Sequence, residues 1–140
     1  DVYKRQVADI PGLIKGAHRG VGLGIQFLKH VERTRLFIHL VDGSGLSGRD
    51  PVEDYLDINH ELKMYDEMNR GKEGFFPLAS RKQIVVINKI DTISERDLLD
   101  LISRFKKQCG VEPLSISAAT SKGLKELVQK VADKVLSRSE

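Results

Sequence analysis

The stretch Ile84-Val85-Val86-Ile87-Asn88-Lys89-Ile90-Asp91 decides the fold. Its first four residues are β-branched and apolar, which is typical of a strand buried on both faces of a parallel sheet. Three polar side chains follow directly, at Asn88, Lys89 and Asp91. Ligands of open α/β sheets bind beyond the carboxyl ends of the strands. We therefore expect these three side chains to face a ligand.

The types of these side chains indicate which ligand it is. A carboxylate at Asp91 can accept two parallel hydrogen bonds from the N1–H and the exocyclic amine of guanine, a pair of donors that adenine does not offer. Asn88 can serve the N7 side of the base and brace neighbouring loops. The apolar stem of Lys89 can lie over the base plane. The plain alternative is a polar strand end, because these residue types are common in loops.

Two further segments carry related chemistry. Val7-Ala8-Asp9-Ile10-Pro11-Gly12 reads as a strand that ends in Asp-x-x-Gly, a turn typical of sites that sense phosphate and magnesium. Ser115-Ile116-Ser117-Ala118-Ala119 reads as a short strand that ends in small residues, whose backbone N–H groups can approach a base oxygen. Together with Asn88 to Asp91, these segments predict a nucleotide site.

The order and spacing of the three segments resemble a translation-factor-class GTPase domain, and more closely the Obg family of ribosome-associated GTPases. The resemblance covers residues 7 to about 136. Its hallmark is a glycine-rich stretch that we expect to act as a switch reordering with the γ-phosphate. That stretch is matched here by Asp9-Ile10-Pro11-Gly12-Leu13-Ile14-Lys15-Gly16-Ala17-His18-Arg19-Gly20-Val21-Gly22-Leu23-Gly24 and continues through Phe27-Leu28-Lys29-His30-Val31-Glu32-Arg33-Thr34.

The resemblance implies an α/β fold with a three-layer, P-loop GTPase-like parallel sheet. It implies GTP or GDP and magnesium as ligands, and a ribosomal subunit or rRNA as partner in ribosome assembly. Asp9 would hold magnesium through water, and the Gly12 N–H would sense the γ-phosphate. Asn88, Lys89 and Asp91 would read guanine, with Ser117 and Ala118 closing over its oxygen. No catalytic residue is assigned, because Leu13 stands where Ras-like enzymes place a water-orienting Gln.

One part of the family pattern is missing. GTPases hold phosphates with Gly-x-x-x-x-Gly-Lys-Ser/Thr, and Gly71-Lys72 is followed by Glu73 instead. We therefore expect residues 7–137 to form the C-terminal portion of an Obg-type GTPase domain, without the phosphate-loop strand and first switch. Alone it should not hydrolyse GTP, and its uncovered edges should favour self-association. Residues 1–6 read as an artefact or a frayed end, because they are too polar for a buried strand.

Composition bounds the class of protein. The chain has 140 residues, a net charge of +3 and a single cysteine, Cys109, so an internal disulfide is impossible. Apolar runs are too short for a membrane span, and we expect a cytoplasmic protein. Basic residues dominate from Lys15 to Arg35, and acidic residues dominate from Asp50 to Glu67. These are either two solvated helix faces or, for the basic stretch, an RNA-facing surface.

The remaining elements alternate as strands and helices. Leu36 to Val41 predicts a buried strand in which His39 is packed or hydrogen-bonded. Asp50 and Pro51 begin a helix, and a loop covers Asn69 to Arg81. The expected inner side of that helix is Val52, Tyr55, Leu56, Ile58, Leu62 and Tyr65. A helix capped by Ser94 and ended by Gly110 follows, then a strand around Pro113 to Ile116. The last helix should bury Leu124, Leu127, Val128, Val131 and Val135, with Lys125, Glu126, Lys130 and Lys134 in water.

Two alternative functions stay open at this point. Gly43-Ser44-Gly45-Leu46-Ser47-Gly48 matches the Gly-x-Gly-x-x-Gly fingerprint of dinucleotide-binding Rossmann modules. However, Asp50-Pro51 places the helix start beyond the third glycine, whereas the fingerprint needs the helix to open within the motif. The second alternative is a protein-interaction module that binds no nucleotide, which the missing phosphate loop favours.

Overall fold

The computed structural model describes residue 7, residues 34–75 and residues 77–136. The chain divides into two compact units. One unit comprises Arg35–Leu56 and Arg81–Glu140, and it contains the sheet. The other comprises Asp1–Thr34 and Asp57–Ser80.

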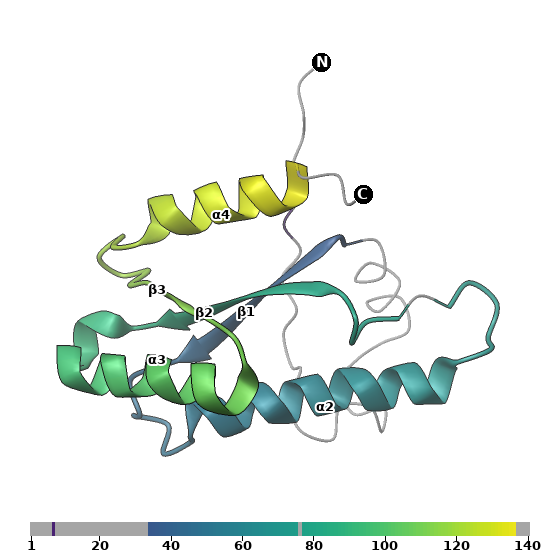
Figure 1. Cartoon of the computed structure of the whole chain (residues 1–140), viewed down its shortest axis with the longest axis horizontal. Coiled ribbons are helices and arrows are strands. Elements are labelled where there is room, and N and C mark those ends of the chain that lie inside the picture. Colours follow the sequence, from purple (N-terminus) through teal and green to yellow (C-terminus); the bar gives the residue numbers. More distant parts are fainter. Residues whose placement is uncertain (1–6, 8–33, 76, 137–140) are drawn as a thin grey trace. The chain divides into compact units, whose positions relative to one another are not determined.

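The sheet has three parallel strands in the order β1-β2-β3 (Figure 1). They are β1 (Leu36–Asp42), β2 (Lys82–Asn88) and β3 (Leu114–Ser115). β1 and β2 pair from Leu36 with Lys82 to Asp42 with Asn88, so their carboxyl ends are level. β3 is shorter than the expected strand. The predicted parallel α/β sheet is confirmed, and right-handed helical crossovers are the usual way to connect such strands.

Helices cover both faces of this sheet. The helices are α2 (Pro51–Asn69), α3 (Glu95–Cys109) and α4 (Leu124–Leu136), with a short 3₁₀ helix η2 (Ile90–Thr92) after β2. On one face, Val85 and Ile87 pack with Phe105 of α3 and with the first turns of α2. On the other face, Ile84 and Val86 pack with Ile116 and the inner side of α4. Figure 1 shows α3 and α4 on opposite sides of the sheet. β2 is therefore buried on both faces, as its apolar run predicts.

Local signals place the helix ends where the sequence predicts them. The Ser94 hydroxyl accepts a hydrogen bond from the Asp97 N–H at 3.1 Å and begins α3. Gly110 ends α3 with φ 66°, a left-handed conformation that glycine adopts without strain. α2 begins at Pro51, and the Asp50 carboxylate accepts from the Val52 N–H at 3.2 Å. Asp50 also forms an ion pair with Arg104, which ties the start of α2 to α3.

Two residues predicted to be buried are exposed. Leu56 is 46% exposed and Val128 is 60% exposed. A helix turns about 100° per residue, so Leu56 lies beyond Tyr55 on the side away from Leu62. Leu127 and Val131 pack against the sheet, and Val128 lies one step past that stripe. Lys130 and Lys134 are half-buried instead of facing water, as long side chains with apolar stems permit.

The second unit contains an internal carboxylate clamp. Asp66 of α2 is 7% exposed and accepts hydrogen bonds from the backbone N–H groups of Leu78 at 2.7 Å and Ala79 at 2.9 Å. Leu78 is buried beside this clamp, and Glu61 is only 3% exposed. The interpretation of the acidic stretch as a solvated helix face is therefore wrong for Glu61 and Asp66. The clamp fixes the end of the loop that leads back into β2.

Candidate nucleotide site

The candidate site lies at the carboxyl ends of the three strands, where Asn88 joins two segments. Its Oδ1 atom accepts hydrogen bonds from the Lys89 N–H at 2.8 Å and from the Ala118 N–H at 3.1 Å. Ala118 follows β3 and is 30 positions away in sequence. Asn88 thus holds the turn after β2 against the turn after β3, which is the bracing role expected of it.

Asp91 and Ser117 meet across the same junction. The Ser117 hydroxyl donates to Asp91 Oδ1 at 2.8 Å and accepts from the Thr120 N–H at 3.2 Å. Ser117 is fully buried, whereas Asp91 is exposed. Among the described residues, the second carboxylate oxygen of Asp91 has no hydrogen-bond donor. One oxygen of Asp91 is therefore held by a buried side chain, and the other can accept hydrogen bonds from a ligand on the solvent side.

The turn that carries Ser117 and Ala118 depends on a glycine. The Ser117 N–H donates to the Lys122 carbonyl oxygen at 2.9 Å, which closes the turn. Gly123 follows with φ +79°, and a Cβ atom there would lie 2.4 Å from the Ser115 carbonyl oxygen. Only glycine permits both the left-handed backbone and this close approach.

The backbone N–H groups of Ser117 and Ala118 already have acceptors inside the chain. These are the Lys122 carbonyl oxygen and Asn88 Oδ1, respectively. The sequence predicts that these N–H groups approach a base oxygen. In the structure, such an oxygen reaches the Ala118 N–H only by sharing it with Asn88 or displacing Asn88.

Lys89 has an unusual backbone and a fixed side chain. Its φ of 65° lies in the left-handed region, which is uncommon for a residue with a Cβ atom. The Thr92 hydroxyl donates to the Lys89 carbonyl oxygen at 2.7 Å. The Lys89 ammonium forms an ion pair of 2.9 Å with Asp42 Oδ2. Strain of this kind is concentrated at functional sites in folded proteins.

Asp42, the last residue of β1, also belongs to the candidate site through its ion pair with Lys89, although the sequence analysis does not identify it. Its Oδ1 accepts from the Ser44 N–H at 2.9 Å. Hydrogen bonds from Ser44 first, and then from Lys89, lower the pKa of Asp42 from 3.8 to about 2. The signal was available in the sequence, because Asp42 follows a buried strand and parallel neighbours end at the same edge.

The glycine-rich loop after β1 does not have the geometry of a dinucleotide fingerprint. α2 begins at Pro51, after Gly48, so no helix opens within the motif. Gly43 has a packing role: a Cβ atom there would lie 2.7 Å from Ile87 Cγ2 and 3.1 Å from the Asn88 carbonyl oxygen. The Gly43 N–H donates to that carbonyl oxygen at 3.0 Å. This glycine allows the ends of β1 and β2 to approach each other closely.

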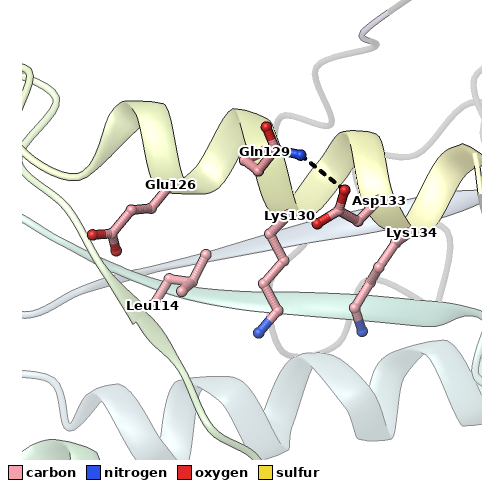
Figure 2. A pocket seen from close by; sticks show the side chains of 6 residues that line it. All are labelled: Leu114, Glu126, Gln129, Lys130, Asp133 and Lys134. Carbon is pink, nitrogen blue, oxygen red and sulfur yellow. Dashed lines mark hydrogen bonds between the residues drawn. The ribbon is translucent and has the colours of Figure 1, made fainter.

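A groove elsewhere in the same unit is a poor candidate for a nucleotide site. Figure 2 shows it along α4, and none of the strand-end residues described above lines it. Charged side chains of both signs surround it, and the Gln129 amide donates to Asp133 at 2.9 Å. Its lining residues are Leu114, Glu126, Gln129, Lys130, Asp133 and Lys134. The mixed charge offers no base-recognising set comparable to Asn88 and Asp91.

Asp9 and Gly12, the predicted magnesium and γ-phosphate residues, lie outside the described residues, as do residues 1–6 and Lys15 to Arg33. Within the described part of the chain, no group of three or more His, Cys, Asp or Glu side chains could hold a metal ion. In that same part, no helix has the length and apolarity needed to cross a membrane.

Comparison with known proteins defines the class. The sequence profile of the family described as 50S ribosome-binding GTPase matches residues 1–89, and the chain belongs to this family. The resemblance to Obg GTPases is confirmed as well. GTPase Obg of Bdellovibrio bacteriovorus is 68% identical over 134 residues, which are 96% of this chain and 39% of that protein. Family membership favours the GTPase interpretation over the dinucleotide-binding one.

Other Obg GTPases match over the same region. The protein of Alkaliphilus metalliredigens is 46% identical over 92% of this chain and 28% of its own length. The protein of Lysinibacillus sphaericus is 48% identical over 91% of this chain and 27% of its own length. The chain therefore spans well under half the length of these relatives. A crystal structure of nucleolar GTP-binding protein 1 from Plasmodium falciparum is also similar, at 17% sequence identity and a TM-score of 0.44. The match covers 91% of this chain and 66% of that one.

Proposed function

We propose that this chain is the guanine-recognising part of a GTP-binding, GTP-hydrolysing regulator of ribosome assembly. The observation that carries the proposal is the joining of the turns after β2 and β3 by Asn88 and Asp91. Asn88 Oδ1 holds the Ala118 N–H, and Asp91 Oδ1 accepts from Ser117. Two segments that each read as nucleotide-binding in the sequence are thereby brought to one sheet edge.

Asp91 supplies the specificity for guanine in this proposal. A carboxylate offers about four acceptor positions, and Ser117 takes one of them. Oδ2 and the remaining lone pair of Oδ1 can together accept hydrogen bonds from the N1–H and the exocyclic amine of guanine. Adenine presents no such pair of donors, so it should bind more weakly. The exposed stem of Lys89 contributes apolar surface to one face of the base.

Magnesium and the γ-phosphate belong to the N-terminal motif. In our proposal Asp9 holds magnesium through water, and the Gly12 N–H contacts the γ-phosphate. Magnesium in this class of reaction neutralises charge that develops on the phosphates. Exchange of GDP for GTP would then alter the Gly12 turn, because only GTP carries the third phosphate.

This 140-residue chain alone should not hydrolyse GTP. It contains no Gly-x-x-x-x-Gly-Lys-Ser/Thr string, which supplies the backbone N–H groups and the lysine that stabilise the transferred phosphate. A single-turnover assay with the purified chain tests this expectation. Magnesium-dependent cleavage of GTP that disappears in Asp9→Ala would contradict it.

The proposed partner is the large ribosomal subunit or its rRNA, in the cytoplasm. The description of the family as 50S ribosome-binding GTPase and the basic stretch from Lys15 to Arg35 support this assignment. Binding through basic residues to RNA phosphates weakens as salt concentration rises. Co-sedimentation with purified 50S subunits at increasing salt tests it. Failure to co-sediment at low salt would count against the partner.

A nitrogen-15 NMR titration tests the guanine site directly. Addition of GDP at millimolar concentration should shift the amide signals of Lys89, Asp91 and Ala118, and ADP should shift them less. Millimolar concentrations are appropriate because the chain lacks the phosphate loop, which carries much of the affinity. Equal shifts with both nucleotides would overturn guanine recognition. The absence of shifts with either would favour the protein-interaction hypothesis.

A further inference from the structure

The Lys89 side chain is anchored at both ends. At the backbone, its N–H donates to Asn88 Oδ1 at 2.8 Å, and its carbonyl oxygen accepts from the Thr92 hydroxyl. At the other end, its ammonium is 2.9 Å from Asp42 Oδ2 on the neighbouring strand. The four-carbon stem therefore runs from the end of β2 toward the end of β1.

The anchor at Asp42 is itself rigid. Asp42 is the register partner of Asn88, and the next residue, Gly43, donates from its N–H to the Asn88 carbonyl oxygen. The other carboxylate oxygen of Asp42 accepts from the Ser44 N–H. With a pKa lowered to about 2, Asp42 is ionised throughout the neutral pH range. It provides a fixed negative charge at a fixed place.

Stability alone does not account for this arrangement. The side chains of Lys89 and Asp42 are 50% and 33% exposed, and exposed ion pairs contribute little to folding. The Lys89 backbone meanwhile adopts a conformation that is unfavourable for a residue with a Cβ atom. The Asp42 ion pair and the left-handed Lys89 backbone together give the lysine stem a defined direction at the carboxyl ends of the strands.

We propose that Asp42 is a positioning residue for base recognition, which acts by holding the Lys89 stem in place as a preformed apolar surface for one face of guanine. This inference rests on the proposed function of the same site. A free lysine side chain would lose rotational freedom when a base packs on it, and that loss weakens binding. Asp42 restricts this freedom before the ligand arrives.

A double-mutant cycle on GDP binding tests the inference in the 140-residue chain. The variants are Asp42→Asn, Lys89→Met and the double variant, each titrated with GDP by NMR. Asp42→Asn should weaken binding by about threefold to tenfold, the loss expected from freeing one long side chain. In the Lys89→Met background, Asp42→Asn should weaken GDP binding by less than about twofold, because the ammonium that Asp42 binds is gone.

A matched control is available in the same unit. Arg49 and Asp54 form another exposed ion pair at 2.8 Å, between the loop after β1 and the first turn of α2, and neither residue contacts Lys89. Asp54→Asn should leave GDP affinity unchanged. The inference is overturned if Asp42→Asn has no effect, or if it weakens binding equally with and without Lys89. The latter result would mean a structural role of Asp42 in the loop after β1.

The failure of this inference can be told apart from failure of the guanine site. Asp91→Asn is titrated alongside, because it replaces one of the two carboxylate acceptors proposed for guanine with an NH2 donor without touching Asp42 or Lys89. If Asp91→Asn abolishes the preference for GDP over ADP while Asp42→Asn is inert, only the positioning role is wrong. If the unsubstituted chain shows no guanine-dependent shifts, both the site and the inference are wrong.

Discussion

The Ser117 hydroxyl donates a 2.8 Å hydrogen bond to the Asp91 carboxylate, although the two residues are 26 positions apart. One partner is fully buried and the other is exposed. A buried donor thus sets the orientation of an exposed acceptor. This contact connects the packing of the β3 turn to the shape of the surface offered to a ligand.

Ser117→Ala should reduce both stability and guanine affinity. The change removes the donor to Asp91 and the acceptor of the Thr120 N–H, so the free energy of unfolding should fall by about 1 kcal/mol. Urea denaturation measures this loss. Ser47→Ala is the control, since the Ser47 hydroxyl accepts an exposed backbone N–H from Arg49 and should matter little. Equal stabilities of the two variants would contradict the prediction.

Asp66→Asn should destabilise the second unit by about 1–3 kcal/mol. The new amide cannot accept from both the Leu78 and Ala79 N–H groups as the carboxylate does, and the site is buried. Amide exchange should show faster exchange at Leu78 and Ala79. Glu67→Gln, at the exposed neighbouring position, should change neither rate. Unchanged protection in Asp66→Asn would show that the clamp does not hold the loop.

Gly123→Ala should be far more harmful than Gly45→Ala. Both glycines have positive φ, +79° and +72°, so both substitutions incur the left-handed backbone cost of about 1–2 kcal/mol. Only at Gly123 would the new Cβ atom meet the Ser115 carbonyl oxygen, at 2.4 Å, whereas nothing lies within 4 Å at Gly45. Thermal unfolding of the two variants provides the comparison. Equal losses of stability would mean that the turn after β3 shifts at little cost to remove the contact with the Ser115 carbonyl oxygen.

The Asp42 carboxylate should titrate near pH 2, well below its ordinary value of 3.8. Since the pKa is lowered in the folded state, the ionised form adds stability above about pH 4, and this stability is lost as pH falls through about 2. Carbon-13 NMR of the side-chain carboxyl measures the midpoint. Lys89→Met should raise the midpoint only in part, because the Ser44 hydrogen bonds remain. A midpoint near 3.8 in the unsubstituted chain would contradict the assigned contacts.

Features governed by local chemistry could be predicted from the sequence. The apolar run before Asn88 predicts β2, and the capping chemistry of Ser94 and Gly110 predicts the ends of α3. His39 was expected to be packed or hydrogen-bonded in the sheet, and it contacts Gln83 and Tyr55. Each of these predictions depends on a few neighbouring residues.

Features set by tertiary packing could not be predicted. The exposed positions of Leu56 and Val128 depend on how each helix is rotated about its axis against its neighbours. A periodic pattern of apolar residues gives this rotation only to within about one residue. The burial of Asp66 depends on backbone N–H groups 12 and 13 positions away. The contact between Asp42 and Lys89 spans 47 positions. The sequence indicates that Asp42 and Lys89 lie at the same edge of the sheet, but the sequence alone does not indicate which side chain or backbone group each charged residue contacts.

The most direct test of guanine recognition is the base preference of Asp91→Asn. An amide at position 91 can donate to the additional base oxygen of xanthine, whereas the carboxylate matches the donors of guanine. We predict that the unsubstituted chain binds GDP more tightly than xanthosine diphosphate, and that Asp91→Asn reverses this order in NMR titrations. Loss of a charge-assisted pair of hydrogen bonds should weaken GDP binding by about 1.5–3 kcal/mol. Unchanged GDP affinity in Asp91→Asn would contradict the assignment of Asp91 as the residue that reads the base.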